Sequence, residues 1–238
     1  MFDFEDDENF YAKTKIIGVG DFGTKIVNYL KSKPLFHTDF AVVAENKIDD
    51  KIFADVDVLF IFTDLTDENI SMQLAEMSKY ILTVTVIPES AKKVEKFQNA
   101  VDVFVTVEDE NIFSMYSAVR CVNGLTEPGL IGLDFYDVKV ILENGGEGYI
   151  AYSKATGKTP TVDAMGSAIN EMKEILQRSK RILFCIFGSN EVLSMIEANE
   201  ASIILQKAAN PDAEIVWGVT IDENCLDFAE VLIIATDL

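Results

Sequence analysis

Short apolar runs alternate with stretches of helical periodicity over the first hundred or so positions. The runs predict strands, several of them apolar enough to be buried on both faces: 14–17, 40–44, 56–63, 81–88 and 101–107. Between them, apolar residues recur at helical spacing, which predicts three helices. The first spans 24–33, the second ends at about Tyr80, and the third spans about 90–98. This β-α-β succession implies a parallel sheet with right-handed crossovers. We therefore expect a Rossmann-like domain.

The second half begins with a longer helical pattern, about 109–125, whose apolar residues cover most sides. We interpret it as a spine between two layers or domains. The pattern beyond it predicts helices ending at Glu143 and spanning 160–177 and 190–208, and strands at 148–153, 181–187, 214–221 and 229–236. Because no crossover helix separates the final two strands, we expect a mixed sheet in a smaller α+β domain.

The domain organisation that follows has four parts. They are an acidic N-terminal arm, a shortened nucleotide-binding-like Rossmann domain, a central spine helix and the C-terminal α+β domain, at 1–13, 14–107, 108–127 and 128–238.

Composition changes this picture by excluding partners. Lys and Arg number 20 against 40 Asp and Glu, a formal charge of −20 in 238 residues, so we expect no binding to nucleic acid. The N-terminus is acidic, unlike a signal peptide, and no apolar run could span a bilayer, so we expect a cytoplasmic protein without membrane insertion. The cysteines, Cys121, Cys185 and Cys225, lie far apart and there is one histidine, which predicts buried reduced thiols, no disulfide and no metal site.

A glycine-rich turn joins the first strand to the first helix. Gly18, Gly20 and Gly23 form G-x-G-x-x-G, and Glu45 follows the next strand. Such glycines allow a tight turn and let a phosphate approach the N–H groups at the helix start. They also serve to pack a helix closely on a strand, and both interpretations stay open. Asp21 lies within the turn, where its carboxylate would repel phosphate.

Two carboxylates follow the spine helix at a spacing of three. Asp134 and Asp137 stand after a Pro-Gly break, on the predicted first turn of a new helix, where that spacing places both on one face. Negative charge is stabilised there by the helix dipole. They are either a functional pair or an N-cap residue with a second acid in the first turn, and the residues alone do not choose between these.

Taken together, these segments resemble the FtsZ/tubulin family of cytoskeletal GTPases. Residues 18–28 are similar to its first phosphate loop, 128–138 to the synergy loop after its central helix, and 213–236 to its closing pair of strands. The resemblance implies a tubulin/FtsZ-like fold. It also implies that Asp134 and Asp137 are catalytic acids acting in trans, on water in the neighbouring subunit's GTP site. The nucleotide contacts that it implies are Gly18, Gly20, Asp21, Phe22, Gly23 and Asn111, the last in place of an acid that contacts guanine.

The sequence departs from the family mainly at the positions where the family binds its nucleotide. The family has glycines at the positions of Asp21, Phe22 and Thr24, and a second phosphate loop rich in Gly and Thr where this chain has the acidic, glycine-free stretch 63–68. A backbone N–H to a charged phosphate contributes roughly 1.5–3 kcal/mol, so losing three or four removes on the order of 5–10 kcal/mol. That exceeds about a thousandfold in affinity. We therefore expect no cofactor, with GTP or GDP the only candidates.

Three functions are consistent with these observations. The first is an FtsZ-like protein that has lost GTP binding and hydrolysis and acts through protein–protein contacts, with filaments of a true FtsZ or with itself. The second is a divergent polymerising GTPase that still binds GTP. The third is an NAD-type dinucleotide-binding protein, in which Gly18, Gly20 and Gly23 contact pyrophosphate and Glu45 the ribose.

Overall fold

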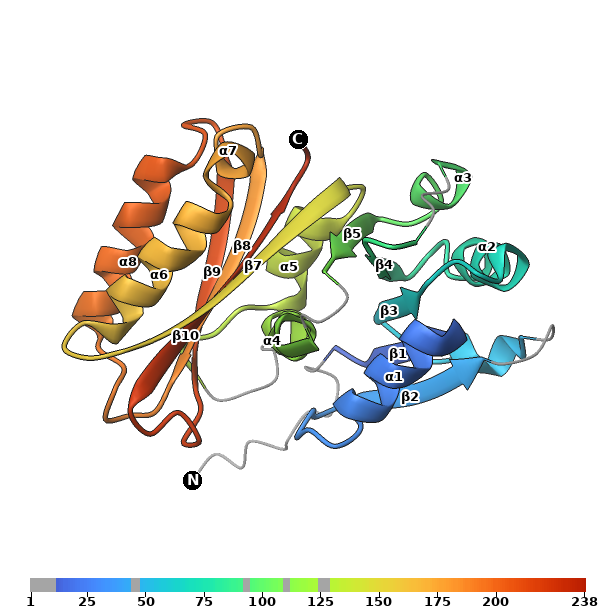
Figure 1. The fold of residues 1–238 in the computed structure, drawn as a ribbon, viewed down its shortest axis with the longest axis horizontal. Coiled ribbons are helices and arrows are strands. Elements are labelled where there is room, and N and C mark those ends of the chain that lie inside the picture. Colours follow the sequence, from blue (N-terminus) through green and yellow to red (C-terminus); the bar gives the residue numbers. More distant parts are fainter. Residues whose placement is uncertain (1–11, 44–47, 92–94, 109–111, 124–128) are drawn as a thin grey trace, which may run out of the picture.

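Ten strands form one continuous sheet in the computed structural model, which describes residues 12–43, 48–91, 95–108, 112–123 and 129–238 (Figure 1). The strands are β1 (Thr14–Val19), β2 (Thr38–Val43), β3 (Val58–Thr63), β4 (Leu82–Pro88), β5 (Val103–Val107), β6 (Gly129–Ile131), β7 (Gly146–Thr156), β8 (Arg181–Gly188), β9 (Glu214–Ile221) and β10 (Phe228–Thr236). Their order across the sheet is β2-β1-β3-β4-β5-β7-β10-β8-β9-β6.

The N-terminal half is parallel, as the sequence predicted. Strands β1 to β5 pair in parallel, and every residue of β3 and β4 is buried. These two strands have an unbroken apolar or small polar sequence because helices cover both faces of this part of the sheet. The edge strand β2 is only partly buried.

The C-terminal half is mixed, which confirms the second prediction about the sheet. Strand β7 continues the parallel half by pairing with β5, and β10 then lies antiparallel between β7 and β8. Strand β9 is parallel to β8, and β6 pairs antiparallel with β9 at the far edge. The short β6 occupies a segment that the sequence indicated as loop; it becomes a strand because the edge of β9 is available for pairing.

The helices follow the predicted order with shifted ends. They are α1 (Gly20–Leu30), α2 (Glu68–Met77), α3 (Glu95–Gln98), α4 (Ile112–Asn123), α5 (Phe135–Leu142), α6 (Pro160–Glu171), α7 (Lys173–Leu176) and α8 (Met195–Ala208), with a 3-10 turn at Asp50–Phe53. The largest shift is in α1, which begins inside the glycine turn. The stretch predicted as one helix over 160–177 is divided at Met172, and the residues before Met195 form a turn.

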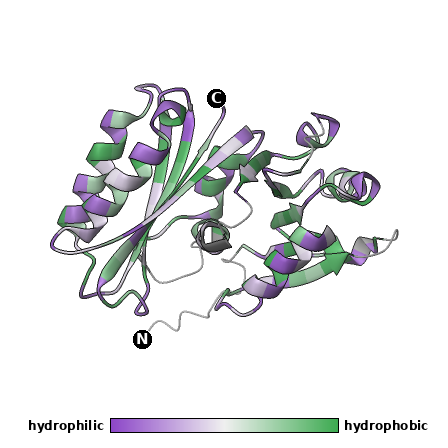
Figure 2. Cartoon of the chain, in the orientation of Figure 1, coloured by the Kyte–Doolittle hydropathy of each residue, from purple (hydrophilic) through white to green (hydrophobic). Residues whose placement is uncertain are grey.

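Alternate residues of β8 separate the helices into two layers. Ile182, Phe184 and Ile186 pack in the cluster that contains α6 and α8, whereas Leu183 and Cys185 face α4 and α5. Figure 1 shows α6 and α8 together on the outer face and α4 and α5 on the inner one. Hydrophilic residues recur along both α6 and α8 (Figure 2), and α8 also exposes Ile196 and Ile203.

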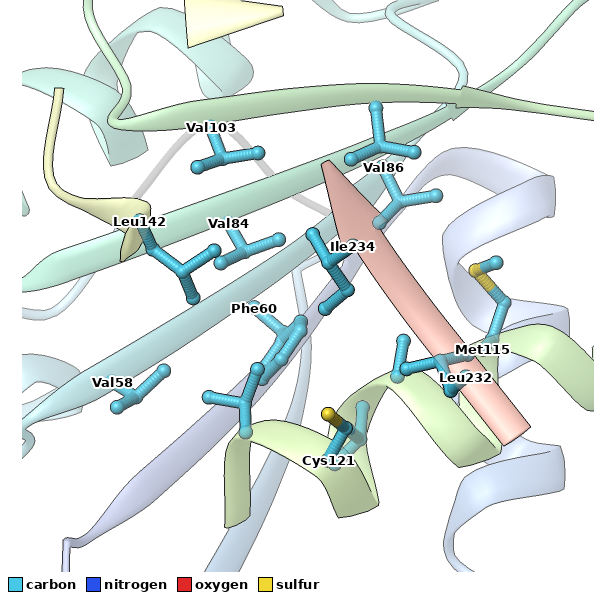
Figure 3. Close-up of a cluster of buried hydrophobic side chains, with 14 of the residues drawn as sticks. Val58, Phe60, Val84, Val86, Val103, Met115, Cys121, Leu142, Leu232 and Ile234 are labelled. Atoms are coloured by element: carbon cyan, nitrogen blue, oxygen red, sulfur yellow. The ribbon is translucent and has the colours of Figure 1, made fainter. Parts of the chain in front are cut away.

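Helix α4 lies in the core that joins the two halves. Its residues Met115, Val119 and Val122 belong to the cluster that also holds Phe60 of β3 and Leu232 of β10 (Figure 3). From Ser114 to Val122 every α4 residue except Tyr116 is buried. The prediction of a spine helix is confirmed for this described part; the remainder of 108–127 lies largely outside the described residues.

One sequence expectation about the core is wrong. Cys121 of α4 and Cys185 of β8 form a disulfide, with Cα atoms 5.6 Å apart, although 64 residues separate them in sequence. The two meet because α4 crosses the inner face of the C-terminal sheet. Cys225 remains a free, buried thiol, as expected.

Candidate functional site

The glycine turn is built to bring α1 very close to the sheet. A Cβ on Gly23 would lie 2.1 Å from the carbonyl oxygen of Phe62 in β3, and one on Gly18 would lie 2.4 Å from the carbonyl oxygen of Gly23. Both contacts are with backbone, which cannot move aside. Gly18 and Gly23 are therefore required for helix–strand packing, whether or not a ligand binds. Gly20 has φ +72°, a conformation that favours glycine.

The acid after β3, Asp64, occupies the start of α1. Its Oδ2 accepts a hydrogen bond from the backbone N–H of Phe22 (3.4 Å), and its Oδ1 accepts from the N–H (3.1 Å) and hydroxyl (2.6 Å) of Thr66. A Cβ on Gly20 would lie 2.4 Å from the same carboxylate. Asp64 thus takes the place beside the helix N-terminus where an anion is favoured.

The charge on Asp64 is maintained by these bonds. Partial burial raises the pKa of the carboxyl, but the hydrogen bonds from Thr66 and Phe22 outweigh it and leave the pKa below its usual value. The carboxylate is consequently ionised at neutral pH. In the sequence, Asp64 stands out only as a member of the acidic stretch that follows β3.

A small acidic hollow lies beside this turn. Its volume is about 260 Å³, and Asp21 and Asp67 both line it. Asp21 is exposed, and Asp67 caps α2 by accepting from the N–H of Ile70 (3.0 Å). Among the other predicted contacts, the ring of Phe22 packs against the core, whereas Asn111 and Glu45 lie outside the described residues. The surroundings of the turn are therefore negative.

Asp134 and Asp137 meet each other in a capping box at the start of α5. Asp134 Oδ1 accepts from the N–H of Asp137 (2.8 Å), and Asp137 Oδ2 accepts from the N–H of Asp134 (3.3 Å). The N-cap interpretation of this pair is confirmed. Asp134 is nevertheless exposed, so its carboxylate also faces solvent and any neighbouring molecule.

The structure does not bring the two predicted sets together. The glycine turn follows β1, next to one edge of the sheet, whereas the capping box follows β6, which forms the other edge. With neighbouring strands about 4.8 Å apart, the eight spacings between β1 and β6 amount to tens of ångströms. No single site within this chain can use both, so any joint action requires two molecules.

A second polar cluster, which the sequence analysis missed, surrounds Arg120 of α4. The Arg120 side chain is 3% exposed, and its guanidinium lies 2.9 Å from Asp222 and 3.7 Å from Glu230. Glu230 also accepts from the hydroxyl of Tyr152 (2.7 Å). Burial raises the pKa of Asp222, but the N–H of Asn224 and the charge of Arg120 outweigh it and hold the pKa below the usual value.

This cluster lines a cleft of about 400 Å³ between α1, α4 and the start of β10. The acids that face the cleft are already paired with Arg120, which makes the cluster a link between α4 and the C-terminal sheet. The sequence signal was Arg120 itself, a cation within an otherwise apolar stretch of the spine helix.

Within the described ranges, no helix combines the length and apolar content that crossing a membrane requires. Across the same residues, no three His, Cys, Asp or Glu side chains gather in a way that could hold a metal ion.

Comparison with known proteins finds similarity to the FtsZ family. Residues 146–238 match the FtsZ family, C-terminal domain. Cell division protein FtsZ 1 of Methanocaldococcus jannaschii is 26% identical over 219 residues, covering 76% of this chain and 60% of that protein. The chain thus spans about 60% of the length of this curated relative.

Solved structures share the whole fold. An empty FtsZ dimer from M. jannaschii has a TM-score of 0.76 at 22% identity, covering 95% of this chain and 88% of that one. CetZ2 from Haloferax volcanii, a GTPgS-bound protofilament, has a TM-score of 0.63 at 13% identity, covering 94% and 92%. At these identities the likeness shows the fold.

Proposed function

Since this chain is an FtsZ/tubulin-family protein, we propose that it has lost GTP binding and hydrolysis and acts by docking onto another FtsZ-family subunit. The observation that carries the proposal is the position of Asp64 at the start of α1. In a phosphate-binding turn the N–H groups there are available to the ligand, whereas here the N–H of Phe22 is bonded to the protein's own carboxylate.

Charge adds to this competition. A phosphate oxygen about 4 Å from the Asp64 carboxylate would be repelled by roughly 4 kcal/mol at an effective dielectric of about 20. Asp21 and Asp67 beside the turn would add to the repulsion. The second loop, from Thr63 to Glu68, has no glycine that would let its backbone approach a phosphate. The same obstacles oppose the pyrophosphate of a dinucleotide.

The docking surface that we propose is the edge formed by β6 and the first turn of α5. Leu130 is 43% exposed and Tyr136 is 73% exposed, and Asp134 lies between them in sequence. In the family resemblance this segment is the synergy loop, which reaches the nucleotide site of the next subunit. Asp134 and Tyr136 would then contact that subunit while this chain offers no working nucleotide site in return, so it would cap a filament end.

We expect titration of the purified protein with fluorescent GTP to show no saturation up to about 1 mM, because losing three or four amide–phosphate bonds costs more than about a thousandfold in affinity. M. jannaschii FtsZ 1 is the positive control. NAD titrated in parallel tests the dinucleotide alternative and should also fail to saturate. Saturable micromolar binding of GTP would refute the loss of the site.

We expect the protein to co-sediment with GTP-assembled filaments of M. jannaschii FtsZ 1. Tyr136→Ala should weaken this association at least about tenfold, since a central aromatic side chain often contributes about 2 kcal/mol to an interface. Tyr80→Ala is the matched control: this tyrosine is 93% exposed but follows α2 in the other half.

Asp134→Asn separates charge from folding in the same assay, because asparagine is an equally good N-cap. Reduced co-sedimentation with an unchanged melting temperature would assign the carboxylate to the interface. The docking proposal fails if the wild type stays in the supernatant, or if Tyr80→Ala and Tyr136→Ala behave alike.

A further inference from the structure

Two consecutive residues near the end of α4 attach this helix to the C-terminal sheet. Cys121 is bonded to Cys185 in the middle of β8, and both side chains are buried, at 0% and 2% exposure. The preceding residue, Arg120, pairs with Asp222 and Glu230 across the same contact. The helix is therefore held to the C-terminal sheet by a covalent bond and by a buried ion cluster.

A polar contact also joins α4 to the N-terminal half, but it is weaker than the disulfide and the Arg120 ion pairs. The ammonium of Lys33, just beyond α1, lies 4.7 Å from the ring centroid of Tyr29 and 5.7 Å from that of Tyr116 on α4. Cation–π contacts of this type are noncovalent and individually weak. Apolar packing in the shared core also attaches α4 to this half. Any movement of α4 is thus restrained most strongly from the C-terminal side.

We propose that Cys121 and Cys185 form a redox-controlled clamp on the connecting helix. In the oxidised protein α4 moves as one body with β8 and β10. In the reduced protein the covalent link is absent, and noncovalent contacts that include the Arg120 ion pairs hold the helix there. This inference does not depend on the proposed function.

The chemistry is thiol–disulfide exchange with a small-molecule disulfide such as oxidised glutathione. One cysteine thiolate attacks the glutathione disulfide, releasing one glutathione thiol and leaving a mixed disulfide. The second cysteine thiolate then displaces the bound glutathione. Two protein thiols are oxidised to one disulfide, and one glutathione disulfide is reduced to two thiols. Since both sulfurs are buried, the first attack requires α4 to open locally.

The third cysteine does not compete for this bond. Cys225 is buried, and burial together with the nearby Asp222 and Glu230 raises the pKa of its thiol to about 12. The thiolate is the attacking species, so a thiol with this pKa reacts slowly at neutral pH. The exchange should therefore stay within the pair formed by Cys121 and Cys185.

The test compares the full chain incubated with oxidised glutathione or with dithiothreitol. After denaturation and alkylation, intact mass should show one alkylated cysteine in the oxidised sample and three in the reduced one. Closing a loop of 64 residues should raise the melting temperature by roughly 4–16 °C. Hydrogen exchange at the α4 amides should slow at least about tenfold on oxidation, with α2 unchanged.

Cys185→Ala should abolish all three responses and melt like the reduced wild type, whereas Cys225→Ala should retain them. Three alkylated cysteines after oxidation, or a persistent glutathione adduct, would overturn the pairing. A disulfide that forms but leaves α4 exchange unchanged would overturn the clamp.

Discussion

Replacing Gly23 by alanine is expected to destabilise the protein by about 4 kcal/mol or more, the range reached when a core contact cannot relax. The added methyl would lie 2.1 Å from the Phe62 carbonyl oxygen and 2.9 Å from the backbone of Gly18. Both obstacles are main chain in strands paired within the sheet, so α1 would have to move off β1 and β3. Urea unfolding followed by circular dichroism measures the loss, with the soluble fraction on expression as the readout if the variant does not fold.

Gly166→Ala is the matched control. Gly166 is also inside a helix, α6, but a Cβ there would meet nothing within 4 Å. Alanine should therefore stabilise this helix by about 0.5–1 kcal/mol. If the free energy of unfolding of Gly23→Ala lies within about 1 kcal/mol of the wild-type value, close packing is not the reason for the glycine. Such a result would favour the interpretation that the turn binds phosphate.

Replacing Arg120 by methionine is expected to cost about 4 kcal/mol, because removing one partner of a buried ion pair leaves uncompensated charge. Asp222 and Glu230 have side chains only 15% and 14% exposed, so water can replace the guanidinium only in part. The variant also loses the stacking of Arg120 over Phe187, 4.1 Å from the ring centroid. Thermal and urea unfolding at pH 7 measure the effect.

The pH dependence identifies the cause. In the wild type, the lowered pKa of Asp222 stabilises the fold above the ordinary carboxyl pKa, and this contribution is lost as the pH falls through the folded-state value. Without Arg120 the pKa of Asp222 should rise toward the ordinary carboxyl value, while the hydrogen bonds from Asn224 continue to lower it, so the stability deficit of the variant relative to the wild type should narrow as the pH falls into the carboxyl range. Asp222→Asn with Glu230→Gln should rescue Arg120→Met at pH 7. Failure of that rescue would show that lost packing, and not charge, accounts for the effect.

Much of the fold could be predicted because its signals are local. The runs that became β3 and β4 are apolar over their whole length, and only a sheet covered on both faces buries such runs. Helix ends were less accurate. The turn Gly18–Gly23 was interpreted as preceding the helix, but α1 starts at Gly20, since glycine conformation alone does not reveal where the first helical hydrogen bond forms.

The candidate sites also differ in whether their contacts are local in the sequence. The spacing of Asp134 and Asp137 predicted a helix N-terminus, and the capping box is a contact over three residues. Asp64, in contrast, accepts a hydrogen bond from the N–H of Phe22, which is 42 residues away in the sequence. No pattern in the acidic stretch distinguishes Asp64 from Asp67. The chain order of β9 and β10 likewise could not show that β10 inserts between β7 and β8.

The sequence by itself determined the succession of strands and helices, the helix cap at Asp134, the acidity around the glycine turn and the family resemblance, because each depends on residues close together in the chain. Only the tertiary structure decided that the Asp64 carboxylate fills the start of α1, that Cys121 meets Cys185, and that Arg120 is neutralised by Asp222 and Glu230. Those contacts join residues tens of positions apart. They arise from the way β3 and β8 are placed beside α1 and α4, which is a property of the packed sheet and not of any segment within it.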